Sequence, residues 1–388
     1  MSESVAWHER ARWQQKAAAP RLAAFALGAI PIVLLGYHDG GYDDRVWTWA
    51  GVALGSVAGL QLALGAPRPR KLALVSLAAL AGLGLLMALS ATWGIEGAEP
   101  AREAQRCALY VAALAAFVVV VRAATARAML LGVLAGILGL ALAALAVRTL
   151  APPPLDPYQG ALLFEPVGYA NALGILMALG VVLSLGLLLD AHGWAARAGL
   201  AASGGVVLLA LALTSSRAAG LAAATGLVAL ALLRFRPSRK VVAGTLVALC
   251  LALVAVGSRA ELGDRGAYWS VARADAAEHP LLGSGAGSFD DYWREHRPIP
   301  ASVQDAHSVY LETAAELGVV GLALLLCALG APLLALRRAQ GKHVAIAAAA
   351  YIAFLAHAGL DWDWEMPVTT IAGLACGAVL LASGLSRS

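Results

Sequence analysis

The sequence predicts an all-α membrane protein, a polytopic bundle of about 12 transmembrane helices. Of its 388 residues, 60% are hydrophobic and 13% are charged, and the mean hydropathy is +0.75. Apolar stretches of about 17 to 25 residues recur from Arg21 onward, each long enough to cross a hydrocarbon core as a helix. Basic and acidic residues alternate between successive connections. These observations exclude a soluble enzyme.

Charged residues, Gly/Pro clusters and aromatic residues mark where each expected helix ends. The first apolar run follows a basic start, but no small-x-small cleavage site follows it, so we interpret it as a helix rather than a signal peptide. The expected spans cover residues 20–37, 47–65, 71–93, 107–121, 128–149, 169–189, 196–214, 216–234, 240–257, 308–336, 343–360 and 367–385.

The connections differ in charge, which predicts the orientation. With the N-terminus inside, the inward loops hold most of the Lys and Arg, and the outward loops hold most of the Asp and Glu. The positive-inside rule therefore predicts cytoplasmic N- and C-termini. Because the net charge of +4 is divided between two membrane faces, it gives no reason to expect a nucleic-acid partner. Five tryptophans fall at predicted outer ends, as in an interfacial aromatic belt: Trp47, Trp49, Trp93, Trp362 and Trp364.

Two outward segments are longer than a connection needs. Residues 151–166 are Pro-rich, and residues 258–306 carry much of the outward charge and many aromatic side chains, with an amphipathic helix expected over 264–278. Long ordered loops often carry function. We expect a cytoplasmic segment (1–19), nine transmembrane helices (20–257), an extracytoplasmic loop over an active site (258–307) and three further helices (308–388).

Three polar stretches near the outer face are candidates for function, because charged groups at membrane depth are unfavourable. Arg217 follows a tight turn between two expected helices, where it either serves a site or reaches lipid phosphate. Arg265 opens a stretch with Tyr268 and Trp269, and the Gly-rich segment 283–287 follows. Its backbone N–H groups either form an anion nest or belong to a flexible turn.

The third stretch lies where the long loop re-enters the membrane. His307 there either accepts a proton from a hydroxyl or anchors the interface. Glu312 and Glu316 share one helix face and need cationic or hydrogen-bonding partners, for which Arg217 and Arg265 are the natural candidates. The acidic residues at 361, 363 and 365 alternate with Trp, which we interpret as an interfacial segment in preference to a divalent-cation site.

Four stretches together resemble the O-antigen ligase and polymerase superfamily of bacterial membrane glycosyltransferases. They are residues 168–172 (Gly-Tyr-Ala-Asn-Ala), 213–217 (Leu-Thr-Ser-Ser-Arg), 280–289 (Pro-Leu-Leu-Gly-Ser-Gly-Ala-Gly-Ser-Phe) and 307–318, from His307 to Gly318. The family commonly has an Asn-Pro-Asn-like stretch where this chain has Tyr169-Ala170-Asn171, and often Asn where it has Ser308. The resemblance implies a C-type glycosyltransferase bundle with its site in an outward cavity under the long loop.

The resemblance also implies a reaction in the bacterial cytoplasmic membrane. A glycan leaves an undecaprenyl diphosphate carrier for an acceptor hydroxyl, with inversion and with no metal or cofactor. Arg217 and Arg265 then bind the donor diphosphate, and His307 is the base. Membrane lipids and an acceptor glycolipid or glycan are the other partners. Substrate contacts are expected from Asn171, Tyr268, Trp269, Tyr310 and Asp361.

Three functions remain open from the sequence. A ligase joins the glycan to lipid A core or another surface acceptor, whereas a polymerase extends it on its carrier; the acceptor alone separates them. A solute transporter is the third, but no internal repeat supports it.

Overall fold

The computed structural model describes residues 3–151, 154–235, 238, 240, 264–339 and 341–383. These residues form helices and no named strand, which confirms the all-α prediction. In the described part of the chain, nine helices are long and apolar enough to span a membrane. The helices are α1 (Glu3–Gly36), η1 (Asp39–Gly41), α2 (Asp44–Ala63), α3 (Lys71–Leu89), η2 (Ser90–Thr92), α4 (Pro100–Val120), α5 (Ala126–Leu150), α6 (Ala170–Leu189), α7 (Trp194–Thr214), α8 (Arg217–Phe235), α10 (Arg265–Glu278), α11 (Phe289–His296), α12 (Val309–Ala335), α13 (Lys342–Ala358) and α14 (Pro367–Ser383).

Eleven of the expected spans coincide with helices, while the ninth, 240–257, lies outside the described residues apart from its first. The amphipathic helix expected over 264–278 is α10. One boundary was wrong: α4 begins at Pro100 rather than 107. Proline is well suited to the first turn of a helix, and the polar first turns of α4 face the protein interior instead of lipid.

The centre of the bundle is formed by α14 and α6, whose residues are almost all buried. Glycines allow this close packing. A Cβ added at Gly373 would lie 2.4 Å from the ring of Phe354 on α13, and one at Gly377 would lie 3.0 Å from Tyr351. Small residues at helix interfaces let backbones approach closely where lipid supplies no hydrophobic drive.

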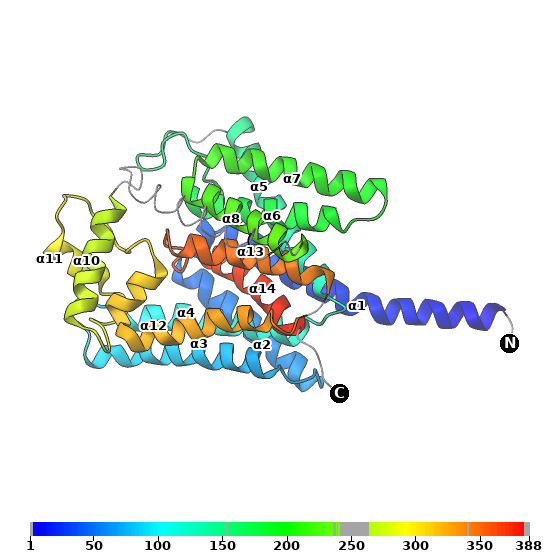
Figure 1. Ribbon diagram of the computed structural model, residues 1–388, viewed down its shortest axis with the longest axis horizontal. Helices are drawn as coiled ribbons and strands as arrows, with labels where there is room; N and C mark the ends of the chain where they lie inside the picture. Colours follow the sequence, from blue (N-terminus) through cyan, green and yellow to red (C-terminus); the bar gives the residue numbers. More distant parts are fainter. Residues whose placement is uncertain are drawn as a thin grey trace.

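The short helices α10 and α11 lie together at one end of the bundle, and the start of α1 and the end of α14 lie at the other (Figure 1). α10 packs against α12, and α11 contacts both. The loop after α13 reaches the same end, because Asp361 in that loop bonds to Arg265 at the start of α10. This end therefore gathers residues that are far apart in the sequence.

Candidate functional site

Asp361 is the centre of a polar cluster that joins three elements. Its carboxylate accepts hydrogen bonds from Arg265 Nη2 at 2.7 Å, Asn171 Nδ2 at 2.6 Å and the Tyr169 hydroxyl at 3.0 Å. The side chain of Asp361 is 1% exposed. A buried carboxylate needs such partners, because desolvation strongly disfavours an unpaired charge. The start of α6, the start of α10 and the loop after α13 are thereby tied together.

The local sequence before α6 explains how two of these donors reach one carboxylate. Gly168 has φ of 82°, and Tyr169 is extended before the helix begins at Ala170. The Ala170 N–H donates to Gln159 Oε1 at 3.0 Å, which satisfies one free N–H of the first turn. Tyr169 and Asn171 therefore leave the backbone on the same side of the helix start and also bond to each other at 2.7 Å.

Arg265 keeps donor capacity beyond its bond to Asp361. Its side chain is 19% exposed, and its Nε–H is buried without a hydrogen-bond partner among the described residues. A guanidinium has five N–H donors in a fixed plane, and it commonly binds phosphate or carboxylate through two of them. Asp361 therefore fixes one nitrogen of the guanidinium, while the Nε–H still lacks an acceptor in the described part of the chain.

His307 lies directly before α12, in a left-handed conformation with φ of 54°. Such a conformation is unfavourable for a residue with a side chain, and strained residues concentrate at functional sites. Its Nδ1 lies 3.0 Å from the Asp305 carbonyl oxygen, which only accepts, so Nδ1 carries the proton and Nε2 is the basic nitrogen of the neutral ring. Burial lowers the pKa of His307, a change that the charge of Asp361 opposes.

Aromatic rings place His307 beside the Asp361 cluster. The His307 ring centroid lies 5.2 Å from that of Tyr268 and 6.3 Å from that of Trp362. Trp362 follows Asp361 and packs on Tyr169 at 4.7 Å. The structure therefore brings His307, Arg265, Asn171, Tyr268 and Asp361 into one region.

The other expected residues have different surroundings. Trp269 is partly buried, and its indole N–H has no hydrogen-bond partner in the described part of the chain. The Tyr310 hydroxyl donates to the Leu355 carbonyl at 2.9 Å, and its ring packs on Gly359, so it joins α12 to α13.

Arg217 is the first residue of α8, and its side chain is exposed. Ser215, with φ of 53°, makes the tight turn before it. That turn packs on α6, because a Cβ added at Gly174 would lie 2.9 Å from the Ser216 Cβ. Gly174 is one helical turn beyond Asn171, so Arg217 lies at the same end of α6 as the Asp361 cluster.

The Gly-rich loop is built against α12. Gly283, Gly285 and Gly287 all have positive φ, and a Cβ added at Gly283 would lie 2.1 Å from the Glu316 backbone. The N–H groups of Gly287 and Phe289 donate to the Glu316 carboxylate at 2.9 and 3.1 Å. These donors do bind an anion, but it is a carboxylate of the protein itself.

This geometry corrects the expectation that Arg217 or Arg265 neutralises the two glutamates of α12. Glu316 accepts from the loop N–H groups, and Glu312 accepts from the Ala306 N–H at 2.7 Å. Backbone N–H groups therefore bind these carboxylates in place of a guanidinium, and the Gly-rich segment was the sequence signal for the donors to Glu316.

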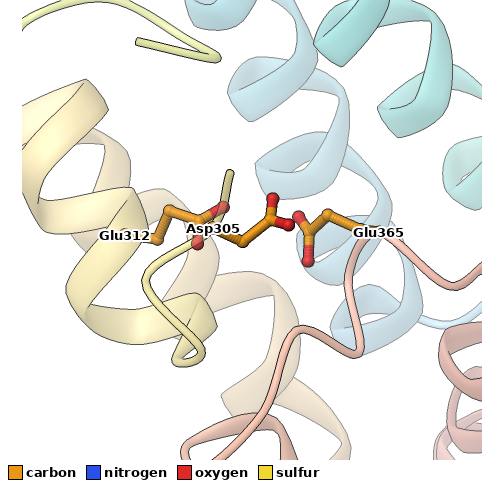
Figure 2. Close-up of side chains that lie close together, drawn as sticks. All are labelled: Asp305, Glu312 and Glu365. Atoms are coloured by element: carbon orange, nitrogen blue, oxygen red, sulfur yellow. The ribbon is translucent and has the colours of Figure 1, made fainter. Parts of the chain in front are cut away.

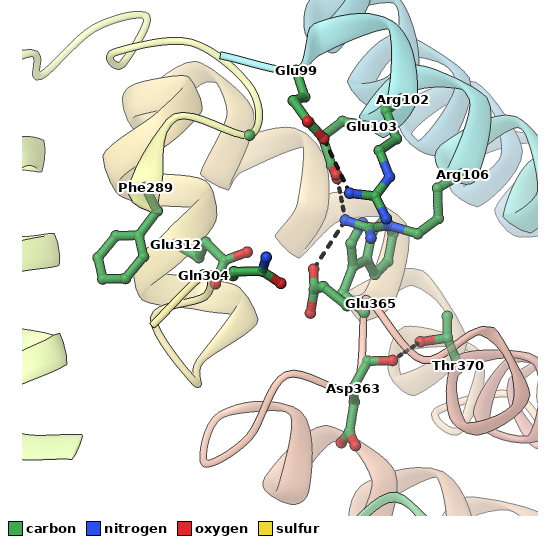
Figure 3. Close-up of polar contacts among 12 residues, drawn as sticks. Glu99, Arg102, Glu103, Arg106, Phe289, Gln304, Glu312, Asp363, Glu365 and Thr370 are labelled. Carbon is green, nitrogen blue, oxygen red and sulfur yellow. Dashed lines mark hydrogen bonds and ion pairs between the residues drawn. The ribbon is translucent and has the colours of Figure 1, made fainter. Parts of the chain in front are cut away.

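A buried ionic network around Arg106 was not predicted from the sequence. Arg106 pairs with Glu103 one turn earlier and with Glu365 at 3.2 Å, and the Arg106 side chain is 4% exposed (Figure 3). Arg102 forms a more exposed pair with Glu99 at 3.0 Å. The i, i+3 spacing of Glu103 and Arg106 is the only sequence signal of this network.

The interfacial interpretation of the 361–365 segment was wrong. Asp361, Asp363 and Glu365 are 1%, 2% and 3% exposed, and Asp363 pairs with the buried His357 at 2.7 Å. Trp47 is also fully buried rather than part of a lipid-facing belt. The guanidiniums of Arg102 and Arg106 lie over its ring. Arg265, His357 and Arg106 pair with Asp361, Asp363 and Glu365, respectively, inside the protein.

Three carboxylates of this region lie close enough to bind one cation. Ligand oxygens of Asp305, Glu312 and Glu365 lie within 4.8 Å of one another (Figure 2). Oxygen sets of this kind suit Mg²⁺ or Ca²⁺. However, Glu312 already accepts from the Ala306 N–H and Glu365 already pairs with Arg106. Burial raises the pKa of Asp305 to about 7, and the Glu103 carboxylate adds to this against the opposing effect of Arg106.

Residues 202–326 match the family model Wzy_C, described as O-antigen ligase. This match confirms the resemblance to the O-antigen ligase family. No curated protein matches the chain significantly.

The O-antigen ligase match runs from α7 into α12 and includes Arg217, Arg265 and His307. Asn171 and Asp361 lie outside it and are joined to it by the hydrogen bonds described above. The nine candidate spans of the described residues indicate a multi-pass membrane protein, which is similar to O-antigen ligases over residues 202–326. The family indicates a glycosyltransferase-like activity, with a lipid-linked glycan and an acceptor as partners.

Proposed function

We propose that the protein moves a glycan from undecaprenyl diphosphate to an acceptor sugar hydroxyl, at the outer face of the bacterial cytoplasmic membrane. One observation carries this proposal: Arg265 and His307 lie in the same region. The Arg265 guanidinium pairs with Asp361 and keeps an unsatisfied Nε–H, and the His307 ring lies beside Trp362, the residue after Asp361. Both residues lie within the O-antigen ligase match.

The donor diphosphate needs cations beside its oxygens. Arg265 offers its buried Nε–H, while Asp361 fixes the guanidinium through Nη2. Arg217, exposed at the α6 end of the cluster, is the second proposed cation. Negative charge develops on the diphosphate as the glycosidic C–O bond breaks, and preorganised guanidiniums stabilise it. The chain's own cations can serve this role, so the proposal requires no metal.

The acceptor hydroxyl becomes a nucleophile as His307 Nε2 takes its proton. The acceptor oxygen then forms a bond to the anomeric carbon, and the bonding electrons leave with the polyprenyl diphosphate. One displacement inverts the anomeric centre. A neutral His307 suits this role, since burial lowers its pKa and Asp305 holds the Nδ1 proton. The Tyr268 and Trp362 rings, which both pack beside His307, are the proposed contacts for the sugar.

The proposed orientation places α10 and α11 outside. The start of α1 and the end of α14 lie at the opposite end of the bundle, which agrees with basic inward loops and cytoplasmic termini (Figure 1). Residues 258–307 then form the extracytoplasmic loop over the site. A ligase acting on lipid A core or another surface acceptor is the first proposal, and a polymerase of the same chemistry is the second.

A transfer assay tests this function. Purified protein in liposomes receives a polyprenyl-diphosphate glycan together with either lipid A core or a second carrier-linked glycan. Transfer to lipid A core supports the ligase, whereas chain growth on the carrier supports the polymerase. Absence of turnover with every pair contradicts the proposal and directs attention to solute uptake by the same liposomes.

A further inference from the structure

A long apolar groove runs between α1 and α2. The two helices follow each other in the chain but diverge, because α1 packs along α5 and α2 packs along α4. Glycines at the α1–α5 contact show how close that packing is, since a Cβ added at Gly132 would lie 2.1 Å from the Phe25 carbonyl oxygen. The remaining space has a volume of about 710 Å³.

The groove has the length and chemistry of a hydrocarbon site. Its α1 wall extends from Ala23 to His38, about 22 Å along the helix, compared with a hydrocarbon core of about 30 Å. Its polar side chains lie at its ends, with His38 and Arg45 at one and Gln61 at the other. Large apolar residues on its walls are exposed; for example, Trp49 is 73% exposed.

The polar mouth of the groove leads to the Asp361 cluster. Tyr42, between His38 and Arg45 in the chain, donates to Gln304 Oε1 at 3.0 Å and packs edge-on against Trp362 at 5.9 Å. Trp362 in turn packs on Tyr169, which bonds to Asp361 beside Arg265. These three half-buried rings form an aromatic row between Tyr42, which lies near the groove mouth in the chain, and Asp361, which bonds to both Tyr169 and Arg265.

We infer that the α1–α2 groove holds the polyprenyl chain of the donor. Tyr42, Trp362 and Tyr169 then contact the first isoprene units, which adjoin the diphosphate position at Arg265. The inference rests on the proposed function. The polyprenyl donor is favoured over a bulk phospholipid because the aromatic row joins this end of the bundle to the proposed diphosphate position at Arg265. Flat rings and isoprene double bonds also make good apolar contact.

The test compares two donors and two variants. Ala53 is exposed and lines the groove, so Ala53→Trp fills it. Ala201→Trp changes an alanine on α7 that is also exposed, and it serves as the control. We expect Ala53→Trp to raise KM for the full-length polyprenyl donor by at least about tenfold. Binding weakens by about this factor when about two methylene groups of the lipid are no longer buried. A donor with only two isoprene units is expected to react equally with both variants and the parent.

A binding readout separates this inference from the proposed function. A polyprenyl diphosphate with a diazirine at its far end is photolysed with the parent in phosphatidylcholine liposomes, and the labelled peptides are mapped. Label on α1 and α2 that Ala53→Trp abolishes supports the groove, even if no glycan is transferred. Label elsewhere, equal labelling by a diazirine phospholipid, or an unchanged KM in Ala53→Trp overturns the groove assignment while leaving the transfer reaction intact.

Discussion

The Arg265 guanidinium and the Asp361 carboxylate lie 2.7 Å apart although 96 positions separate them in the sequence. This bond fixes the start of α10 to the loop before α14, and the same carboxylate holds Tyr169 and Asn171. Asp361 therefore determines where the guanidinium points. Arg265 lies inside the O-antigen ligase match and Asp361 outside it, so the site is assembled from both parts of the chain.

Replacing Asp361 by Asn keeps the shape of the side chain and removes the charge that orients Arg265. We expect kcat for glycan transfer to fall by about 10²-fold, because misplaced groups lose that much rate even when contact remains. Steady-state kinetics in liposomes measures the change. Glu96→Gln, which neutralises an exposed acid, is expected to behave as the parent. Equal rates for all three proteins would exclude a positioning role for Asp361.

The Gly283 position tolerates no side chain. Its φ is 71°, and a Cβ would lie 2.1 Å from the Glu316 backbone, so Gly283→Ala separates the Gly-rich loop from α12. We expect a loss of more than about 2 kcal/mol of stability. Thermal unfolding in detergent measures it. Gly266→Ala is the matched control, since a Cβ there meets nothing within 4 Å and α10 gains a better helix former. Similar melting curves for both variants would contradict this packing.

The Arg106 network has a clear stability signature. Arg106→Met leaves Glu103 and Glu365 buried without their cation, and breaking a buried pair from one side typically destabilises by about 3 to 5 kcal/mol. Arg102→Met removes a pair that is 38% and 54% exposed, and we expect a loss of no more than about 1 kcal/mol. The comparison is made by unfolding both proteins in the same detergent. An equally small loss in both would show that Arg106 is not needed to neutralise these acids.

Asp305 predicts a dependence of stability on pH. Its folded-state pKa is about 7, well above the value of about 3.9 for an exposed Asp, so the folded protein binds this proton more tightly than the unfolded chain does. The stabilisation is complete below the unfolded pKa and is lost as pH rises towards 7. The melting temperature should therefore fall between about pH 4 and about pH 7. Asp305→Asn should flatten this fall and raise the melting temperature at the upper end.

The control for this titration is Asp44→Asn, which changes an exposed residue at the start of α2. It is expected to leave the pH dependence of the parent unchanged. A steep fall that survives in Asp305→Asn would assign the titration to another buried acid.

The sequence predicted the membrane helices well, because bilayer thickness sets the length of each apolar run. Arg265 and His307 were candidates because of their polar character at expected helix ends, and the structure brings them into one region around Asp361 and Trp362. The partners could not be read in the same way. Arg106 and Glu365 are 259 positions apart, and the donors to Glu316 are backbone N–H groups. Burial of the 361–365 acids depends on these long-range contacts, so a local pattern of Trp and acid looked interfacial.

The most direct test of the central claim is single-turnover glycan transfer by His307→Ala with saturating polyprenyl-diphosphate donor. Loss of a general base is expected to lower the transfer rate by about 10²- to 10⁴-fold, with donor binding unchanged. His192→Ala, in the exposed connection between α6 and α7, is expected to match the parent. A normal transfer rate in His307→Ala would contradict the account, because no base would then be required at this position.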